Sequence, residues 1–177
     1  VGTEFAGRKT NFAPHLLTAC DEEKARQLIA DPNFVAQIKH DGERRYVAYK
    51  DGKTTFANRS GLEVPGKEEI VKSVEYLAAQ GFSDFELDCE DMGSYLETFD
   101  ILSIDGVDLR DKGFSERFKH LGGIELALRR SQHGAILRMI GTAPLRVSIN
   151  PKYRTLNSLL LPIFILFSSS WAWRRQH

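Results

Sequence analysis

The fold prediction starts from the hexapeptide Lys39-His40-Asp41-Gly42-Glu43-Arg44. The residues before it alternate, so that Phe34, Ala36 and Ile38 share one side of an extended chain while Val35, Gln37 and Lys39 share the other. This alternation predicts a half-buried strand over Phe34–Lys39. Asp41-Gly42 is typical of hairpin turns because both residue types tolerate positive φ. We therefore expect a hairpin whose first strand ends at Lys39, with the amine held by a rigid element beside a turn that a ligand can approach.

More strands and helices are expected on both sides of this hexapeptide. Two strands should follow it at Arg44–Lys50 and Thr54–Asn58, joined by the turn dipeptide Asp51-Gly52. Periodicity and caps predict helices at Cys20–Ala30 (capped by Thr18), Lys67–Gln80, Ser115–Leu121 and Ile124–Ser131, the last two separated by Gly122-Gly123. Apolar runs predict strands at Phe85–Met92, Leu96–Ile104 and Ile136–Ile140. Short strands with tight turns predict an α+β fold of mainly antiparallel sheets flanked by helices.

Composition limits the class of protein. The 177 residues are 42% hydrophobic and 27% charged, which fits one globular domain and excludes a disordered chain, a collagen or a disulfide scaffold. The two cysteines, Cys20 and Cys89, have no zinc-type spacing with each other or with histidines. This indicates a reducing, intracellular compartment, most simply the cytoplasm.

Charge is unevenly distributed along the chain. All 24 Asp and Glu lie in residues 1–125 with 16 Lys and Arg, whereas residues 126–177 hold the other 8 basic residues, so the two parts carry net charges of −8 and +8. Such a split indicates either a basic face for a polyanion or two segments of different origin.

Both ends of the chain differ from the middle. Residues 1–5 resemble the translation of adjoining cloning sites and are set apart from the fold. Residues 155–173 carry no charge, but Pro162 and Ser168-Ser169-Ser170 interrupt the apolar run, which disfavours a membrane helix of roughly 20 residues. We expect a buried strand or a non-native tail there. The predicted division is therefore a partial domain over 6–145 and an atypical tail over 146–177.

The spacing Lys-x-Asp-Gly-x-Arg fixes four positions, and a chance match in a chain of this length is on the order of one in a thousand. On this motif the sequence resembles the covalent nucleotidyltransferases, which are ATP-dependent DNA ligases, RNA ligases and mRNA capping enzymes. The resemblance implies that Lys39 attacks the α-phosphate of ATP in the presence of Mg²⁺, forming a lysyl-AMP and releasing pyrophosphate.

Because lysine is ordinarily protonated at neutral pH, its pKa must be lowered by nearby positive charge or by burial. We expect Arg44, Arg59 and a bound metal ion to supply that charge.

Later segments match the DNA ligases in the order of that family. Asn58-Arg59-Ser60-Gly61 resembles its S-R-S-G element, and Leu87-Asp88-Cys89-Glu90 resembles L-D-G-E with Cys in place of Gly. Phe99-Asp100-Ile101-Leu102 and Glu116-Arg117 resemble its next strand and helix. The resemblance implies that Arg44 and Arg59 contact phosphate and sugar, that Glu90 contacts ribose or metal, and that Phe99 stacks on the base. It also places Gln37 near the adenine edge and Ile38 in the nucleotide site, and we expect Arg117 to form a structural ion pair.

The acidic residues of this region form a second pattern. Alternation along a strand would put Glu86, Asp88 and Glu90 on one face. Three crowded carboxylates repel one another unless a cation or an arginine offsets them. This pattern is compatible either with a metal site or with an acidic edge.

Two family elements have no counterpart in the sequence. No acid follows Glu125 to provide an E-G strand, and Lys152 is the only lysine beyond Lys119, so the phosphate-binding K-x-K pair is missing. The resemblance therefore implies an incomplete nucleotidyltransferase (ATP-grasp-like) fold without an oligonucleotide-binding barrel. We expect part of a DNA ligase that seals nicked duplex DNA in replication, repair and recombination, weakly active or inactive as this chain. The alternatives are an RNA ligase, a capping guanylyltransferase or a non-catalytic nucleic-acid-binding remnant.

Overall fold

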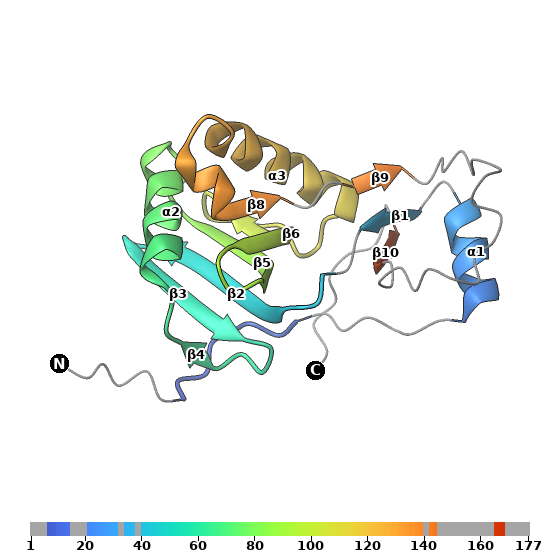
Figure 1. The fold of residues 1–177 in the computed structure, drawn as a ribbon, viewed down its shortest axis with the longest axis horizontal. Helices are drawn as coiled ribbons and strands as arrows, with labels where there is room; N and C mark the ends of the chain where they lie inside the picture. The colour runs from blue at the N-terminus through green and yellow to red at the C-terminus, as the bar shows by residue number, and fades with distance from the viewer. Residues whose placement is uncertain are drawn as a thin grey trace.

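The computed structural model of this protein describes residues 7–14, 21–31, 34–37, 40–139, 142–144 and 165–168. Figure 1 shows the elements in chain order: α1 (Glu22–Ala30), β1 (Phe34–Gln37), β2 (Glu43–Lys50), β3 (Lys53–Asn58), β4 (Glu63–Val64), α2 (Glu68–Ala79), β5 (Phe85–Asp91), β6 (Leu96–Ile104), β7 (Val107–Asp108), α3 (Phe114–Leu128), the 3-10 helix η1 (Gln132–Ala135), β8 (Leu137–Met139), β9 (Thr142–Pro144) and β10 (Ile165–Ser168).

The described strands form two sheets. The larger has seven strands, with the order β4-β3-β2-β5-β6-β7 and β8 beside β6, and the smaller has the order β10-β1-β9. The pairs are antiparallel except for β6 with β8. The predicted α+β class with mainly antiparallel sheets flanked by helices is confirmed.

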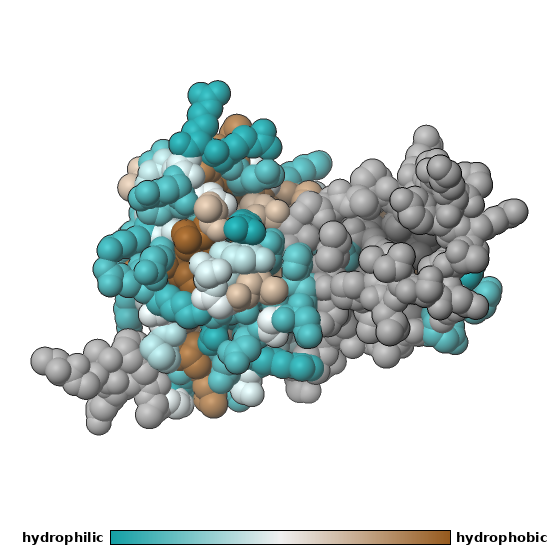
Figure 2. All heavy atoms as spheres, in the orientation of Figure 1, coloured by the Kyte–Doolittle hydropathy of each residue, from teal (hydrophilic) through white to brown (hydrophobic). Residues whose placement is uncertain are grey.

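Helices α2 and α3 cover one face of the larger sheet (Figure 1). The main core lies between these two helices and the sheet. There Val47 and Leu87 of the sheet meet Val74 and Leu77 of α2 and Ile124 of α3, and all five side chains are fully buried. A fully buried aliphatic side chain stabilises the fold by about 1.5–3 kcal/mol. Hydrophilic residues dominate the described surface in Figure 2, where hydrophobic residues form only small separate patches.

The opposite face of the larger sheet, here called the polar face, is formed by Arg44, Tyr46, Glu86, Asp88 and Glu90. These residues alternate along β2 and β5 with the core residues Val47, Leu87 and Cys89, so they point away from α2 and α3. A small second core covers the far end of this face, where the Phe12 ring stacks on Tyr46 at 4.7 Å between centroids.

Most predicted elements are confirmed, with bounds shifted by one or two residues. β6 is found at Leu96–Ile104 as predicted, and the Asp51-Gly52 hairpin joins β2 to β3 with φ of 50° and 75°. The first helix begins later than predicted: its N-cap is Asp21, whose carboxylate accepts a hydrogen bond from the Lys24 N–H at 2.8 Å. Thr18, the predicted cap, lies outside the described residues.

The predicted hairpin at Asp41-Gly42 is wrong. β1 pairs with β9 and β10, whereas β2 pairs with β3 and β5, so the two strands flanking this turn belong to different sheets. Gly42 is required for space and not for a hairpin φ, because a Cβ there would lie 2.5 Å from the Asp91 carbonyl oxygen. Because β3 and β5 pair with the two edges of β2, β1 cannot pair with β2 and joins the smaller sheet instead.

The predicted break at Gly122-Gly123 is also wrong, because α3 runs without interruption over both glycines. Leu121, Ile124 and Leu128 are buried on the core side of this helix. Their packing outweighs the weak helix preference of glycine, which is about 1 kcal/mol per residue relative to alanine.

Gly122→Ala is expected to raise the free energy of unfolding by about 0.5–1 kcal/mol, since a continuous helix gains from the better helix former. Gly122 is exposed, and no atom lies within 4 Å of its would-be Cβ. Urea denaturation measures the change. The control is Gly61→Ala, which should lower stability because Gly61 has φ +75° and a Cβ there would lie 2.6 Å from the Phe12 carbonyl oxygen. A loss of stability in Gly122→Ala would contradict the continuous helix.

The tail beyond residue 145 is described only at β10, which is a strand in the smaller sheet. The other residues of the predicted tail, and the predicted scar at residues 1–5, lie outside the described residues. No helix in the described part of the chain combines the length and apolar character that a membrane span requires.

Candidate functional site: the polar face and its junction with the smaller sheet

Arg44 is the centre of the polar face. It lies next to the start of β2, and its Nε and terminal nitrogen donate to the two Asp88 oxygens at 2.9 and 2.5 Å. Burial works to lower the pKa of Arg44, but the charge of Asp88 and the hydrogen bonds to it leave that pKa raised above its usual value. Arg44 is therefore a permanently charged group in a fixed orientation, with much of its charge compensated by Asp88.

Phe99 lies against Arg44, although β6 is two strands away from β2. The Arg44 guanidinium carbon is 5.1 Å from the centre of the Phe99 ring, a cation–π distance. The register of β5 with β6 shifts between Asp88 and Cys89, so that Phe99 is an extra residue in β6. Such a bulge redirects a side chain, which explains how this ring reaches the polar face. The ring is 6% exposed, so a stacked base requires the covering groups to move.

Gln37 reaches the same place from the smaller sheet. Its Nε2 donates to the Phe99 carbonyl oxygen at 3.2 Å, and the residue is 1% exposed. Its Oε1 is buried without a hydrogen-bond partner in the described structure. The amide orientation is fixed by chemistry, because turning it over would set its oxygen against the carbonyl oxygen. An unpaired buried acceptor costs about 1–3 kcal/mol, so the oxygen is suited to a ligand that brings a donor.

Glu90 is held beside the turn of the Lys-x-Asp-Gly-x-Arg motif. It pairs with Arg44 across β2 and β5, and its Oε1 accepts a hydrogen bond from the Gly42 N–H at 3.1 Å. The contact brings Glu90 to the turn that follows Lys39 in sequence. It depends on glycine at 42, because the backbone of β5 leaves no room for a side chain there.

The alternation predicted for the acidic residues of β5 is confirmed, and arginines offset two of them. Arg110 forms an ion pair with Glu86, and Arg44 forms one with Asp88. No group of three or more His, Cys, Asp or Glu side chains in the described residues is arranged to hold a metal ion. Glu90 differs from Glu86 and Asp88 because it forms no ion pair with an arginine among the described residues. Its contact with a metal ion stays a prediction.

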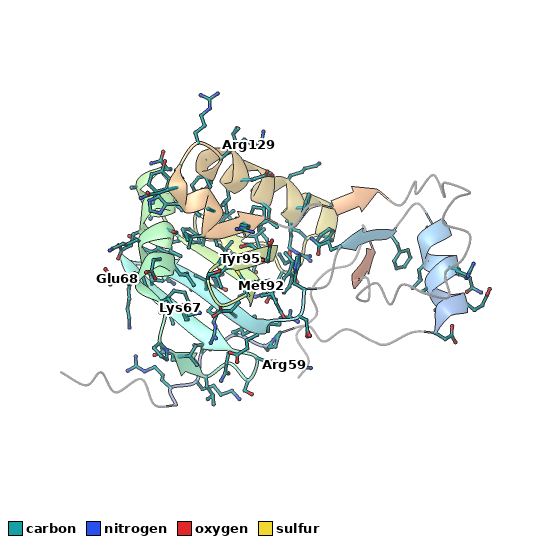
Figure 3. The ribbon with its side chains drawn as sticks, in the orientation of Figure 1. Arg59, Lys67, Glu68, Met92, Tyr95 and Arg129 are labelled. Atoms are coloured by element: carbon teal, nitrogen blue, oxygen red, sulfur yellow. The ribbon has the colours of Figure 1, made fainter. Side chains whose placement is uncertain are left out.

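Arg59 is not brought into this group. It is exposed on the turn after β3, at the lower edge of the sheet in Figure 3, and it contacts neither Arg44 nor Phe99 by any hydrogen bond or ion pair of the described residues. Ile38 and Lys39 lie outside the described residues. Of the predicted site residues, the structure brings Gln37, Arg44, Glu90 and Phe99 together, and their roles in binding a nucleotide stay predictions.

Cys89, which stands where the ligase pattern has glycine, does not intrude on the polar face. It is fully buried in the main core, and its Sγ lies 3.3 Å from the Thr98 Oγ1. Burial raises the pKa of this thiol well above its ordinary value. The departure from the pattern is therefore accommodated on the helix side of the sheet.

Arg117 confirms its predicted structural role. Its guanidinium donates to both Asp100 oxygens at 2.8 Å, and both side chains are almost fully buried. The contact of Asp88 with Arg44 was not predicted from the sequence. The alternation of acids along β5 carried that signal, since the register of β2 with β5 sets Asp88 within reach of Arg44.

A cavity of about 610 Å³ lies on the other side of the motif turn. Its lining includes Gly42, Arg45, Phe56, Lys67, Ile70 and Met92, and Figure 3 shows Lys67 and Met92 at this place. Arg45 and Lys67 both bind Asp91 there. The cavity contains none of Gln37, Arg44 and Phe99, and is separate from the polar face.

The described residues share their fold with solved structures of ligases. No protein-family model matches the sequence, and no curated protein matches it. Among solved structures, the ligase domain of LigD from M. tuberculosis aligns with a TM-score of 0.54 and 17% identity over 80% of this chain. Structures named Pmar-Lig_Pre and Pmar-Lig_PreS3 align with TM-scores of 0.52 and 0.53, each at 15% identity, over 71% and 73% of this chain.

These alignments cover only part of the solved proteins. The chain spans 49% of the LigD ligase domain and 34% and 35% of the other two. At such low identity the likeness concerns the fold, and the chemistry has to be argued from this chain's own residues.

Proposed function

We propose that this chain is part of the adenylation domain of an ATP-dependent DNA ligase. In the proposed reaction the unprotonated amine of Lys39 attacks the α-phosphorus of ATP. A P–N bond forms, the bond to the bridging oxygen breaks, pyrophosphate leaves and the amine gives up a proton. The AMP then passes to the 5′-phosphate of a nick, and the 3′-hydroxyl displaces AMP to seal the strand. The motif from Lys39 to Arg44 and the ligase fold support this proposal.

The observation that carries the proposal is the group formed by Gln37, Arg44 and Phe99. An aromatic ring, a fixed guanidinium and an unpaired buried acceptor meet at one place, although they come from three strands of two sheets. These are suitable contacts for a base and its attached sugar and phosphates. The orphaned oxygen of Gln37 indicates that the site is incomplete without a ligand that donates a hydrogen bond.

The same oxygen favours adenine over guanine. One N–H of the Gln37 Nε2 donates to the Phe99 carbonyl, whereas the buried Oε1 has no partner, so the oxygen is the atom that needs a donor from a base. Adenine offers an amino group at position 6, which can donate to that oxygen, whereas guanine offers a carbonyl there, which would repel it. This argues against a capping guanylyltransferase and for an enzyme that uses ATP.

Mg²⁺ fits this site only together with the nucleotide. Mg²⁺ is commonly held by one or two carboxylates plus substrate phosphates, and Glu90 offers one carboxylate beside the motif turn. Bound there, the ion would supply positive charge against the triphosphate. The residues of the chain itself would orient the nucleotide, through Arg44 and Gln37.

Gln37→Leu is expected to weaken ATP binding about tenfold, because one buried hydrogen bond is worth about 1–1.5 kcal/mol. GTP, which we expect to bind more weakly to the unmodified chain, should change much less. Titration calorimetry with the full chain and Mg²⁺ measures both affinities. The matched control is Gln80→Leu, at an exposed position on the end of α2, which should leave both unchanged. Equal affinity for ATP and GTP, unaffected by Gln37→Leu, would overturn the adenine site.

A non-catalytic nucleic-acid-binding protein is the second candidate, favoured by the absence of a K-x-K pair from the sequence. Such a pair would be needed to stabilise the leaving pyrophosphate. This candidate predicts salt-dependent binding to nicked duplex DNA without any ATP-derived adduct. A ligase should bind the nicked duplex and also form the adduct.

A further inference from the structure

The cavity of about 610 Å³ beside the motif turn lies on the helix side of the larger sheet. Arg45 belongs to that side, because it pairs with the core residue Cys89 across β2 and β5. Lys67, which precedes α2, and Met92, which follows β5, also line the cavity (Figure 3). Its volume falls in the range of about 300–1,000 Å³ that is typical of small-molecule sites. None of the described residues proposed to bind the nucleotide lines it, so the proposed function leaves this cavity unexplained.

The most buried residues of the lining are apolar. Phe56, Ile70 and Leu96 belong to the main core, and each is no more than 5% exposed. The Phe56 ring packs so closely on the Gly66 backbone that a Cβ at Gly66 would lie 2.0 Å from a ring carbon. An aromatic ring fixed in this way offers a flat surface to the apolar part of a ligand.

Two basic side chains of the lining share one carboxylate, and these three residues are here called the Asp91 trio. The Arg45 Nη2 donates to one Asp91 oxygen at 3.3 Å, and the Lys67 Nζ donates to the other at 3.5 Å. The side chains of Arg45 and Asp91 are each 12% exposed, and that of Lys67 is 50% exposed. Two positive charges against one negative charge leave the trio with an excess of positive charge.

Both cations of the Asp91 trio keep hydrogen-bond donors for a ligand. The guanidinium has five N–H donors, and among the described residues Arg45 uses only those of Nη2, toward Glu43 and Asp91. Its Nε and Nη1 therefore have no partner there. Lys67 donates to Asp91 and to the Gly93 carbonyl oxygen, which leaves one N–H of its ammonium group. Charged N–H donors form their strongest hydrogen bonds with oxyanions.

The acidic residues Asp41 and Glu43 also line the cavity, but they lie at exposed positions. The Glu43 side chain is 82% exposed, although it contacts Arg45 at 3.1 Å. Solvent screens such charges strongly and screens partly buried charges much less. The Asp91 trio therefore sets the sign of the site, which is positive.

We propose that this cavity binds a small organic anion. Its oxyanion head would accept hydrogen bonds from Arg45 and Lys67, and its flat apolar body would lie against Phe56. Carboxylates and phosphate esters share this chemistry. A ligand there would also contact Gly42, which borders the cavity between Asp91 and Met92, and would thus lie beside the motif turn without entering the polar face.

The test is a titration of the full chain, labelled with ¹⁵N, followed by the chemical shifts of its backbone amides. The probes are phenyl phosphate and benzoate, compared with benzylamine, a cation with the same ring, and with inorganic phosphate, which lacks the ring. At least one aromatic anion should shift the amides of Gly42, Gly66 and Gly93, which border the cavity. It should bind about tenfold or more tightly than benzylamine and inorganic phosphate, and the tighter of the two anions identifies the preferred head.

Two variants test the proposed contacts with the better anion. Arg45→Gln and Lys67→Gln should each weaken its binding about tenfold, because each removes a hydrogen bond from a charged donor. Lys67→Gln leaves Asp91 paired with Arg45, so this variant should keep the fold even if Arg45→Gln does not. The matched control is Lys72→Gln, which removes the same charge from an exposed ion pair on α2 and should leave the affinity unchanged.

Each contrary outcome overturns a stated part of the proposal. Equal binding of benzylamine would overturn the sign of the ligand, and equal binding of inorganic phosphate would overturn the role of the apolar lining. An unchanged affinity in Lys67→Gln, or no binding of either aromatic anion, would overturn the site itself. Shifts centred on Gln37 and Phe99 would assign the anion to the polar face instead. ATP labelling of Lys39 is measured separately, so the proposed function stands or fails independently of these results.

Discussion

Arg117→Met is expected to lower the free energy of unfolding by about 3–5 kcal/mol, because removing one partner of a buried ion pair leaves the other charge uncompensated. Arg117 links α3 to β6 through two hydrogen bonds to Asp100, and it also donates to the Lys112 carbonyl. Its side chain is 3% exposed and that of Asp100 is 6% exposed. Small domains are stable by only about 5–15 kcal/mol in total, so the variant should lose a large share of its stability.

Urea denaturation followed by circular dichroism measures this loss. Arg129→Ala is the control, since its pair with Glu125 is 65% and 50% exposed and such surface pairs contribute at most about 1 kcal/mol. The double variant Asp100→Leu/Arg117→Met should recover part of the stability, because apolar side chains can replace a buried pair. A loss in Arg117→Met no larger than in Arg129→Ala would show that the pair is not buried as described.

Lys39→Ala is expected to abolish covalent labelling by ATP carrying a radioactive α-phosphate, with a loss of at least about a hundredfold, because the variant has no amine nucleophile. The unmodified chain should label slowly, since the sequence offers no lysine pair for the leaving pyrophosphate. Long incubation of the full chain with excess ATP and Mg²⁺ is therefore needed. Calorimetry should show that Lys39→Ala still binds ATP.

Two controls separate the nucleophile from its charge. Lys39→Arg keeps a positive charge but presents a guanidinium that stays protonated, so it too should not label. Lys50→Ala removes another lysine, at the exposed end of β2, and should label like the unmodified chain. Undiminished labelling of Lys39→Ala would remove Lys39 from the mechanism.

Local patterns predicted local structure well. The alternation of polar and apolar residues correctly predicted that Glu86 and Asp88 share one face of β5. The residue types Asp51-Gly52 correctly predicted the hairpin between β2 and β3. The side of β5 and the hairpin are each decided within a few residues of sequence. The structural ion pair of Arg117 was predicted from the resemblance of Glu116-Arg117 to the ligase pattern, and its partner Asp100 lies 17 positions away.

Features decided by distant partners were not predictable. The contact of Gln37 with Phe99 joins residues 62 positions apart and depends on a bulge that the β6 sequence does not reveal. The false hairpin at Asp41-Gly42 has the same origin, because β5 and not β1 occupies the second edge of β2. Gly122-Gly123 failed as a break because packing of α3 outweighed local preference.

Peptide mass spectrometry of the unmodified chain after incubation with ATP and Mg²⁺ most directly addresses whether one lysine of the motif acts as the nucleophile. The predicted result is an AMP adduct, at low yield and labile in acid, confined to the peptide that contains Lys39 and absent from Lys39→Ala. An adduct on a different residue, or no adduct on a chain shown to bind ATP, would contradict the assignment.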